Sequence, residues 1–156
     1  MQWSTIAATA VGTVLGVIAT LAADHVRWRR DRAERDRDTL RVAFTEYLAA
    51  LSRARDAFSR TAPCPDRVGE GHIAIGEHGV YAAQQQLELV ARRRLVDRAG
   101  RATLSVLDFH DAVAAGHTPH SPEYVHAWRT AGRARTALIE EMRAALHRNR
   151  DTARPS

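Results

Sequence analysis

The chain opens with an uncharged stretch, Met1 to Ala23, that reads MQWSTIAATAVGTVLGVIATLAA. Residues 4–23 would form about 30 Å of α-helix, which matches the hydrocarbon thickness of a bilayer. Trp3 and Trp28 bracket the stretch, where aromatic rings favour the two membrane interfaces. A core helix of a globular protein rarely runs this long without a charge. We therefore predict a transmembrane anchor at residues 1–23, with Trp3 and Trp28 as its interfacial residues.

The charges that follow the stretch orient it. Seven arginines lie between Asp24 and Arg41, whereas only the α-amino group precedes the stretch. The positive-inside rule therefore predicts an uncleaved, single-pass helix with the N-terminus outside and the C-terminal domain in the cytoplasm. A cleaved signal peptide, the competing interpretation, carries its basic residues before the apolar core and not after it. We expect the first four arginines to form a cationic collar that contacts anionic lipid headgroups: Arg27, Arg29, Arg30 and Arg32.

Small residues recur at every fourth position of the predicted span. They form a stripe on one helix face, the association face: Ser4, Ala8, Gly12, Gly16 and Thr20. Small side chains at this spacing let two helix backbones approach closely, so that van der Waals contact drives pairing in lipid. The stripe predicts a homo-oligomer, most simply a homodimer.

Composition limits the classes of function. The chain has 156 residues, enough for one domain beside the anchor. Its 23 basic residues are all arginine, which is typical of GC-rich bacterial genomes. Together with the predicted span, this predicts a location in the bacterial cell membrane. Part of the net charge of +5 arises in residues 24–41, where seven arginines alternate with five acids, so no nucleic-acid-binding face is predicted. A single cysteine, Cys64, cannot form an internal disulfide, in agreement with a reducing cytoplasm.

Downstream of the span, helical signals continue. Residues 26–60 contain neither proline nor glycine, and residues 24–39 carry opposite charges at helical spacing, such as Asp31 and Arg35. We interpret residues 24–39 as a charged juxtamembrane helix continuous with the span. An apolar seam with alternating steps of four and three then begins, as in a coiled coil or a bundle: Leu40, Phe44, Tyr47, Leu51, Ala54 and Phe58.

Three further helical segments are expected after the prolines at 63 and 65. Residues 63–79 should form a loop with one helical turn near 73–75. A second helix over about 77–91 points Val80, Leu87 and Val90 inward. A third carries the apolar positions Leu95, Ala99, Ala102, Val106, Phe109 and Val113. Gly116 should end this helix.

The last helix has the clearest start signal. Ser121 is a suitable N-cap, and Pro122 and Glu123 suit the first turn. Its inward positions are Tyr124, Trp128, Ala131, Leu138, Met142 and Leu146. The predicted fold is all-α: an N-terminal transmembrane helix, continuous with a long cytoplasmic helix, packs in a three- to four-helix antiparallel bundle over residues 40–150. Residues 151–156 should form a disordered tail.

No motif with catalytic, cofactor-binding or metal-binding spacing is recognised. His117 and His120 precede His126, but no His-Glu-x-x-His pattern is present, so we predict no metal site. The glycines between 69 and 79 follow no strand and lead to no Gly-Lys-Ser/Thr, so they predict no phosphate cradle. Arg92, Arg93 and Arg94 are interpreted as a solvated helix face, with phosphate or lipid headgroups as the alternative ligands.

The order of features resembles a family known from actinobacteria. A short outer N-terminus, a span with Gly12 and Gly16, the run RWRRDRAER at 27–35 and FTEYLAAL at 44–51 are similar to small actinobacterial single-pass membrane proteins of uncharacterised function. Some of these are named after the KilB plasmid-spread proteins of streptomycetes. The resemblance covers residues 5–60 best and brings no catalytic residues with it. It implies a membrane-associated accessory role, linked to plasmid transfer between mycelia.

These observations lead to one functional prediction and one alternative. The prediction is a non-enzymatic, membrane-anchored helical docking or assembly protein. Its partners would be membrane lipids, a second copy of itself and an unidentified protein in the cytoplasm or membrane. The alternative is a small ligand- or metal-responsive membrane-bound regulator that uses the His117, His120 and His126 region.

Overall fold

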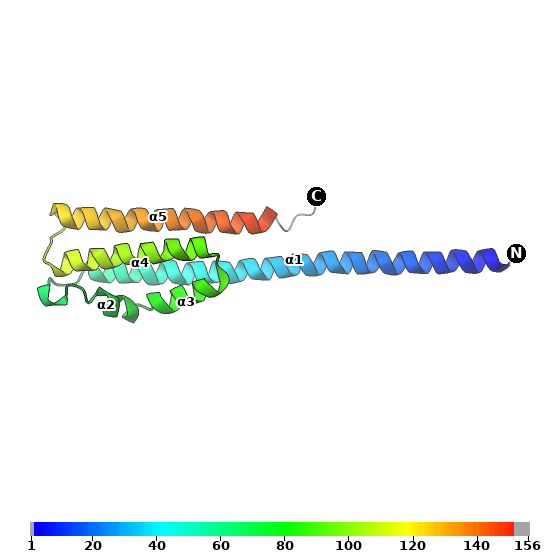
Figure 1. Ribbon diagram of the computed structural model, residues 1–156, viewed down its shortest axis with the longest axis horizontal. Helices are drawn as coiled ribbons and strands as arrows, with labels where there is room; N and C mark the ends of the chain where they lie inside the picture. Colours follow the sequence, from blue (N-terminus) through cyan, green and yellow to red (C-terminus); the bar gives the residue numbers. More distant parts are fainter. Residues whose placement is uncertain (1, 152–156) are drawn as a thin grey trace.

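A computed structural model describes residues 2–151 of the chain, with side chains for residues 24, 25 and 27–148. All regular structure over this range is helical. The elements are α1 (Gln2–Phe58), the short 3-10 helix η1 (Pro65–Arg67), α2 (Gly71–Glu77), α3 (Val80–Val90), α4 (Arg93–Ala114) and α5 (Pro122–Asp151). The five α-helices pack together, and the N-terminal half of α1 projects from one end of the bundle (Figure 1). The predicted all-α class is therefore confirmed.

Successive segments of the bundle run in alternating directions. α1 leads into the bundle, α2 and α3 return along it, α4 runs parallel to α1, and α5 returns again (Figure 1). The most extensive helix contacts are those of α4 with α5 and of α1 with α3. Because the chain reverses between elements, the junction of α3 and α4 and the C-terminal part of α5 lie at the end where α1 leaves.

Local chemistry sets the helix ends. The Ser121 hydroxyl accepts a hydrogen bond from the main-chain N–H of Tyr124 at 3.3 Å, which caps α5 as predicted. Gly116 has φ of +92° directly after α4, the left-handed conformation that glycine adopts without a Cβ clash. Gly79 has φ of +74° and separates α2 from α3. The second predicted helix therefore begins at Val80 and not at 77.

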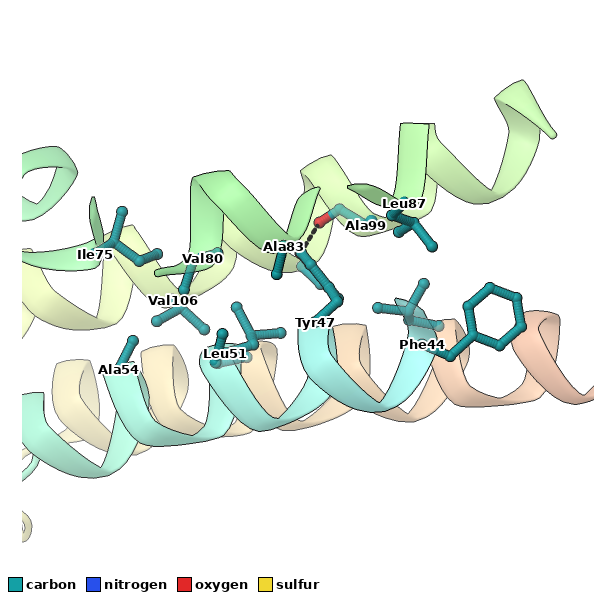
Figure 2. Packing of buried hydrophobic residues seen from close by; sticks show 14 of the residues in the cluster. Phe44, Tyr47, Leu51, Ala54, Ile75, Val80, Ala83, Leu87, Ala99 and Val106 are labelled. Atoms are coloured by element: carbon teal, nitrogen blue, oxygen red, sulfur yellow. Dashed lines mark hydrogen bonds between the residues drawn. The ribbon is translucent and has the colours of Figure 1, made fainter. Parts of the chain in front are cut away.

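The predicted seam of α1 forms one wall of the core. All six seam positions are buried, from Leu40 at 9 % exposure to Tyr47 and Ala54 at 0 %. All six inward positions predicted for the third helix are likewise buried in α4. Figure 2 shows Phe44, Tyr47 and Leu51 of α1 pointing toward Val80 and Leu87 of α3. Burying each large apolar side chain contributes about 1.5–3 kcal/mol relative to leaving it exposed.

The other inward positions were predicted with one error. In α5, Ala131, Leu138 and Met142 are buried, and its three remaining inward positions are partly buried against the core: Tyr124, Trp128 and Leu146. Val90 was expected to point inward and is 37 % exposed instead. It is the last residue of α3, where the helix has already passed beyond the buried face that Val80 and Leu87 share.

Residues 63–79 are more ordered than the prediction of a loop with one turn. They contain η1 and the two-turn helix α2, whose Ile75 is fully buried. Gly71 makes the close contact of α2 with α4 possible, because a Cβ at this position would lie 2.9 Å from Nδ1 of His110. The glycines that suggested a loop thus include one that permits helix packing.

The predicted membrane span lies where the structure gives no side chains. Among the residues whose side chains the structure describes, which exclude residues 1–23, no helix is long and apolar enough to cross a membrane. The association face and Trp3 belong to the same excluded part. Residues 152–156 of the predicted tail also lie outside the described residues, whereas Asp151 is the last residue of α5.

A buried hydroxyl network joins three helices. The Tyr47 hydroxyl donates to the main-chain oxygen of Ala99 at 2.7 Å (Figure 2). It also lies 2.7 Å from the Thr103 hydroxyl. The Thr103 hydroxyl also lies 3.3 Å from Oε1 of Gln84 on α3. Burial raises the pKa of Tyr47 to about 12, and the hydrogen bond with Thr103 offsets part of that rise. The phenol is therefore neutral throughout the physiological range.

Replacing Tyr47 with Phe removes the hydroxyl while keeping the ring. We expect the free energy of unfolding to fall by about 1 kcal/mol at neutral pH, because the α1–α4 hydrogen bond is lost. Urea unfolding followed by circular dichroism measures this difference. Tyr81→Phe is the control, since Tyr81 is 41 % exposed and should change stability little.

The difference in the free energy of unfolding between wild type and Tyr47→Phe should depend on pH. The unfolded phenol ionises near its model value of 10.0, whereas the folded phenol holds its proton to about 12. Stability from this group is complete below pH 10 and is lost as pH rises toward 12, by about 1.4 kcal/mol at pH 11. The stability advantage of wild type over Tyr47→Phe, about 1 kcal/mol at pH 9, should therefore disappear or slightly reverse by pH 11. An equal difference at both pH values would contradict the assignment.

Two glycine substitutions should change stability in opposite directions. Gly71→Ala places a Cβ 2.9 Å from His110 and 3.1 Å from Leu107, and should cost about 1–3 kcal/mol. Gly100→Ala, inside α4, meets nothing within 4 Å and should stabilise by about 0.5–1 kcal/mol through helix propensity. Thermal unfolding of the two variants compares them directly, and a destabilised Gly100→Ala would show that α4 is not packed as described.

Candidate functional site

The predicted collar lies on the exposed part of α1 before the bundle. Arg27, Arg29, Arg30 and Arg32 are all exposed. Trp28 is 53 % exposed, and the Arg32 guanidinium lies 5.3 Å from its ring centroid, a cation–π contact. The His25 ring stacks on the Trp28 ring, and the two ring centroids lie 6.4 Å apart. The collar is thus accessible to an anionic surface, and its contact with lipid stays a prediction.

Residues 24–39, which include the collar, form a mostly exposed stretch of α1 that leads into the bundle. Leu40 is the first buried residue of α1 among those whose side chains are described. The predicted pair of Asp31 and Arg35 takes a different form, because Nε of Arg35 donates to the main-chain oxygen of Asp31 at 3.2 Å. Arg41 pairs with Asp38 at 3.0 Å, and both side chains are more than half exposed. Such a pair contributes little to stability, at most about 1 kcal/mol.

A pocket of 480 Å³ opens beside the point where α1 enters the bundle. We call it the cationic pocket. It is lined by apolar residues of α1, α3, α4 and α5 and of the α3–α4 junction: Leu40, Phe44, Val90, Ala91, Leu95 and Ala145. Four charged residues complete it: Arg92, Arg94, Glu141 and Arg148.

A carboxylate with two guanidinium partners sits in the wall of this pocket. Glu141 Oε2 lies 3.5 Å from Nε of Arg94, and Oε1 lies 3.4 Å from an amino nitrogen of Arg148. The Glu141 side chain is only 13 % exposed, whereas that of Arg94 is 75 % exposed. Three arginines against one carboxylate leave the lining with a positive balance. The sequence-based interpretation of Arg92–Arg94 as a solvated face therefore describes only part of their environment.

An exposed apolar strip lies next to the cationic pocket, on the groove between α1 and α3. It consists of Val42, Leu89 and Val90, which are 57 %, 86 % and 37 % exposed. Charged and polar residues of both helices border it, among them Arg35, Asp38 and Glu46. Val90 lines both the strip and the pocket. Exposed apolar side chains gathered in this way are typical of interaction surfaces.

The histidines are distributed through the bundle and serve local structure. His110 is 5 % exposed, and its Nδ1 lies 3.0 Å from Oδ1 of Asp111. The same carboxylate oxygen accepts the main-chain N–H of Gly69 at 2.9 Å, which ties the η1–α2 segment to α4. His117 pairs with Glu123 at 3.6 Å, whereas His120 and His126 are exposed.

Within the described residues, no three histidine, cysteine or acidic side chains gather closely enough to hold a metal ion. The candidate ligands His117, His120 and His126 are therefore not assembled into a site here. Cys64 is half-buried, and its main-chain N–H donates to the oxygen of Ala114 at 3.1 Å. Cys64 thus lies in the loop after α1, and this hydrogen bond holds it to the end of α4.

A comparison of the chain with protein-family models, with curated proteins and with solved structures finds no match in any of the three. The resemblance of residues 5–60 to the KilB-named group therefore stays a prediction.

Replacing Asp111 with Ala should loosen the η1–α2 segment. The variant removes the acceptor for the Gly69 N–H, so amide exchange at Gly69 should accelerate about tenfold or more. Hydrogen exchange followed by NMR measures the rate. Asp108→Ala, on an exposed position of the same helix, is the matched control and should leave Gly69 unchanged. Equal acceleration in both variants would mean that α4 itself had been destabilised.

Proposed function

We propose that the protein is a non-enzymatic, single-pass membrane protein whose helical bundle acts as a docking or assembly module on the cytoplasmic side. The observation that carries this proposal is α1, a single helix from Gln2 to Phe58. Its sequence begins uncharged, continues with exposed charges and ends as the apolar wall of the core. One helix therefore links the proposed anchor to the bundle without a hinge.

The proposed membrane geometry follows from charge and length. Residues 1–23 span the bacterial cell membrane with the N-terminus outside, and the collar contacts anionic lipids. Residues 24–39 then hold the bundle about 24 Å from the inner membrane surface when the helix stands upright. The resemblance adds a setting to this proposal, an accessory role in plasmid spread or in another membrane process.

The partner in the proposed assembly is a second copy of the chain. Two anchors that pair through Gly12 and Gly16 are parallel, and they place both bundles at the same depth. Both apolar strips then lie at the membrane-proximal end of their bundles, where Val42 and Leu89 expose apolar surface. Burying this surface against its counterpart supplies a second contact. The dimer in turn presents an enlarged surface for a further, unidentified protein partner.

Cysteine crosslinking in native membranes tests the assembly. In a Cys64→Ser background, Val42→Cys should give a disulfide-linked dimer on mild oxidation. Leu104→Cys, a 60 % exposed position of α4 outside the strip, is the matched control and should give none. Adding Gly12→Ile and Gly16→Ile, or Leu89→Asp, should reduce the Val42 crosslink severalfold.

Two results would reject parts of the proposal separately. Release of the wild-type chain from membranes by alkaline carbonate would reject the proposed transmembrane anchor. If Val42→Cys gives only monomers, the proposed dimer is rejected. The same holds if the glycine and Leu89 substitutions leave the crosslink unchanged. Neither result affects the proposed anchor.

A further inference from the structure

The cationic pocket combines two features that usually occur apart. Its floor is apolar, with Leu40, Phe44 and Leu95 less than 10 % exposed. Its rim is charged, with Arg92, Arg94 and Arg148 around a single carboxylate. Its volume of 480 Å³ falls within the range of about 300–1,000 Å³ typical of small-molecule sites. A ligand that satisfies both features has an apolar body and an anionic end.

The charge distribution places the anionic end of such a ligand. Glu141 already engages Arg94 and Arg148, at 3.5 Å and 3.4 Å. Arg92 also lines the pocket and has no carboxylate among the ion pairs of the described residues. It is the N-cap residue of α4, whose first-turn N–H groups add positive partial charge. An anion at Arg92 and Arg94 would therefore face an excess of positive charge.

The apolar lining places the other end. Phe44 and Leu95 lie on α1 and α4, and Ala145 lies on α5, so the pocket runs inward between three helices. Burying each methylene of an aliphatic chain there contributes about 0.8 kcal/mol. A bare phosphate or carboxylate would leave this apolar surface uncovered. We propose that the cationic pocket binds a single-chain anionic amphiphile, with a carboxylate or phosphate head at Arg92 and Arg94 and an aliphatic chain against Phe44 and Leu95.

The source of this amphiphile is a free molecule and not a lipid embedded in the bilayer. Leu40 follows Asp24 by about 24 Å of helix, which keeps the pocket away from the headgroups when α1 stands upright. This choice of source, and only this choice, rests on the proposed function. The chemistry of the pocket is independent of the anchor, because every lining residue belongs to the bundle or to its edge.

The test uses the full chain in nanodiscs of neutral phosphatidylcholine, because detergents are themselves amphiphiles. Isothermal titration with dodecyl phosphate, corrected with empty nanodiscs, should give saturable binding. Dodecanol and inorganic phosphate should each bind at least tenfold more weakly, since each supplies one half of the chemistry. A diazirine-bearing dodecanoate should label the peptides that contain Phe44, Leu95 or Ala145.

Three variants distinguish the pocket from general charge. Arg92→Gln should weaken dodecyl phosphate binding about tenfold. Arg93→Gln is the matched control, because Arg93 is the exposed neighbour that does not line the pocket, and should leave binding unchanged. Ala145→Trp should fill the pocket and abolish binding. If Ala145→Trp fails to fold, the Arg92 and Arg93 pair still decides the result.

Several outcomes would overturn the proposal. Equal weakening by Arg92→Gln and Arg93→Gln would indicate nonspecific attraction to surface charge. Phosphate binding as tightly as dodecyl phosphate would indicate a site for an ion only. Dodecanol binding as tightly would indicate a purely apolar pocket. Labelling that is lost when the nanodisc contains phosphatidylglycerol would indicate that a bilayer lipid occupies the pocket. It would overturn the free source, and with α1 still membrane-bound it would leave the proposed anchor intact.

Discussion

The apolar face of α1 from Leu40 to Phe58 is the surface on which the rest of the bundle is assembled. The other four α-helices all contact α1. Tyr47, at the middle of this face, is hydrogen-bonded to the backbone of α4. Most of the stability of helices in proteins comes from packing their apolar faces against one another. The bundle therefore depends on α1 being helical through this region, which the absence of proline and glycine over residues 26–60 favours.

Much of this arrangement was predictable from the sequence because the signals are repeated. Six apolar positions at helical spacing in α1 and six in α4 define a buried face even if one is misjudged. The N-cap at Ser121 and the stop at Gly116 act through neighbouring residues, so their effect is also local. Val90 was misjudged because a single apolar residue at a helix end carries no such repetition.

The features that escaped prediction depend on contacts between distant residues. Gly71 read as a loop residue, and its role is set by His110, which lies 2.9 Å from where its Cβ would be. The cationic pocket joins residues around positions 40, 92 and 145, which no local pattern connects. Arg92–Arg94 was the one visible signal, and Glu141, the partner of Arg94, lies 47 residues later on the next helix, α5. The exposure of the collar arginines, in contrast, was predictable because these residues are close together in sequence, and their contact with lipid stays a prediction.

The continuity of α1 has a consequence for the orientation of the bundle. A helix advances about 1.5 Å and turns about 100° per residue. Inserting one residue between the collar and Leu40 would hardly change the height of the bundle, yet it would turn the cationic pocket and the apolar strip by more than a quarter of a circle. The length of residues 24–39 thus sets an angular phase between the two ends of α1. Variants that add seven residues, close to two full turns, nearly preserve this phase, whereas additions of two or five residues reverse the face that the bundle presents.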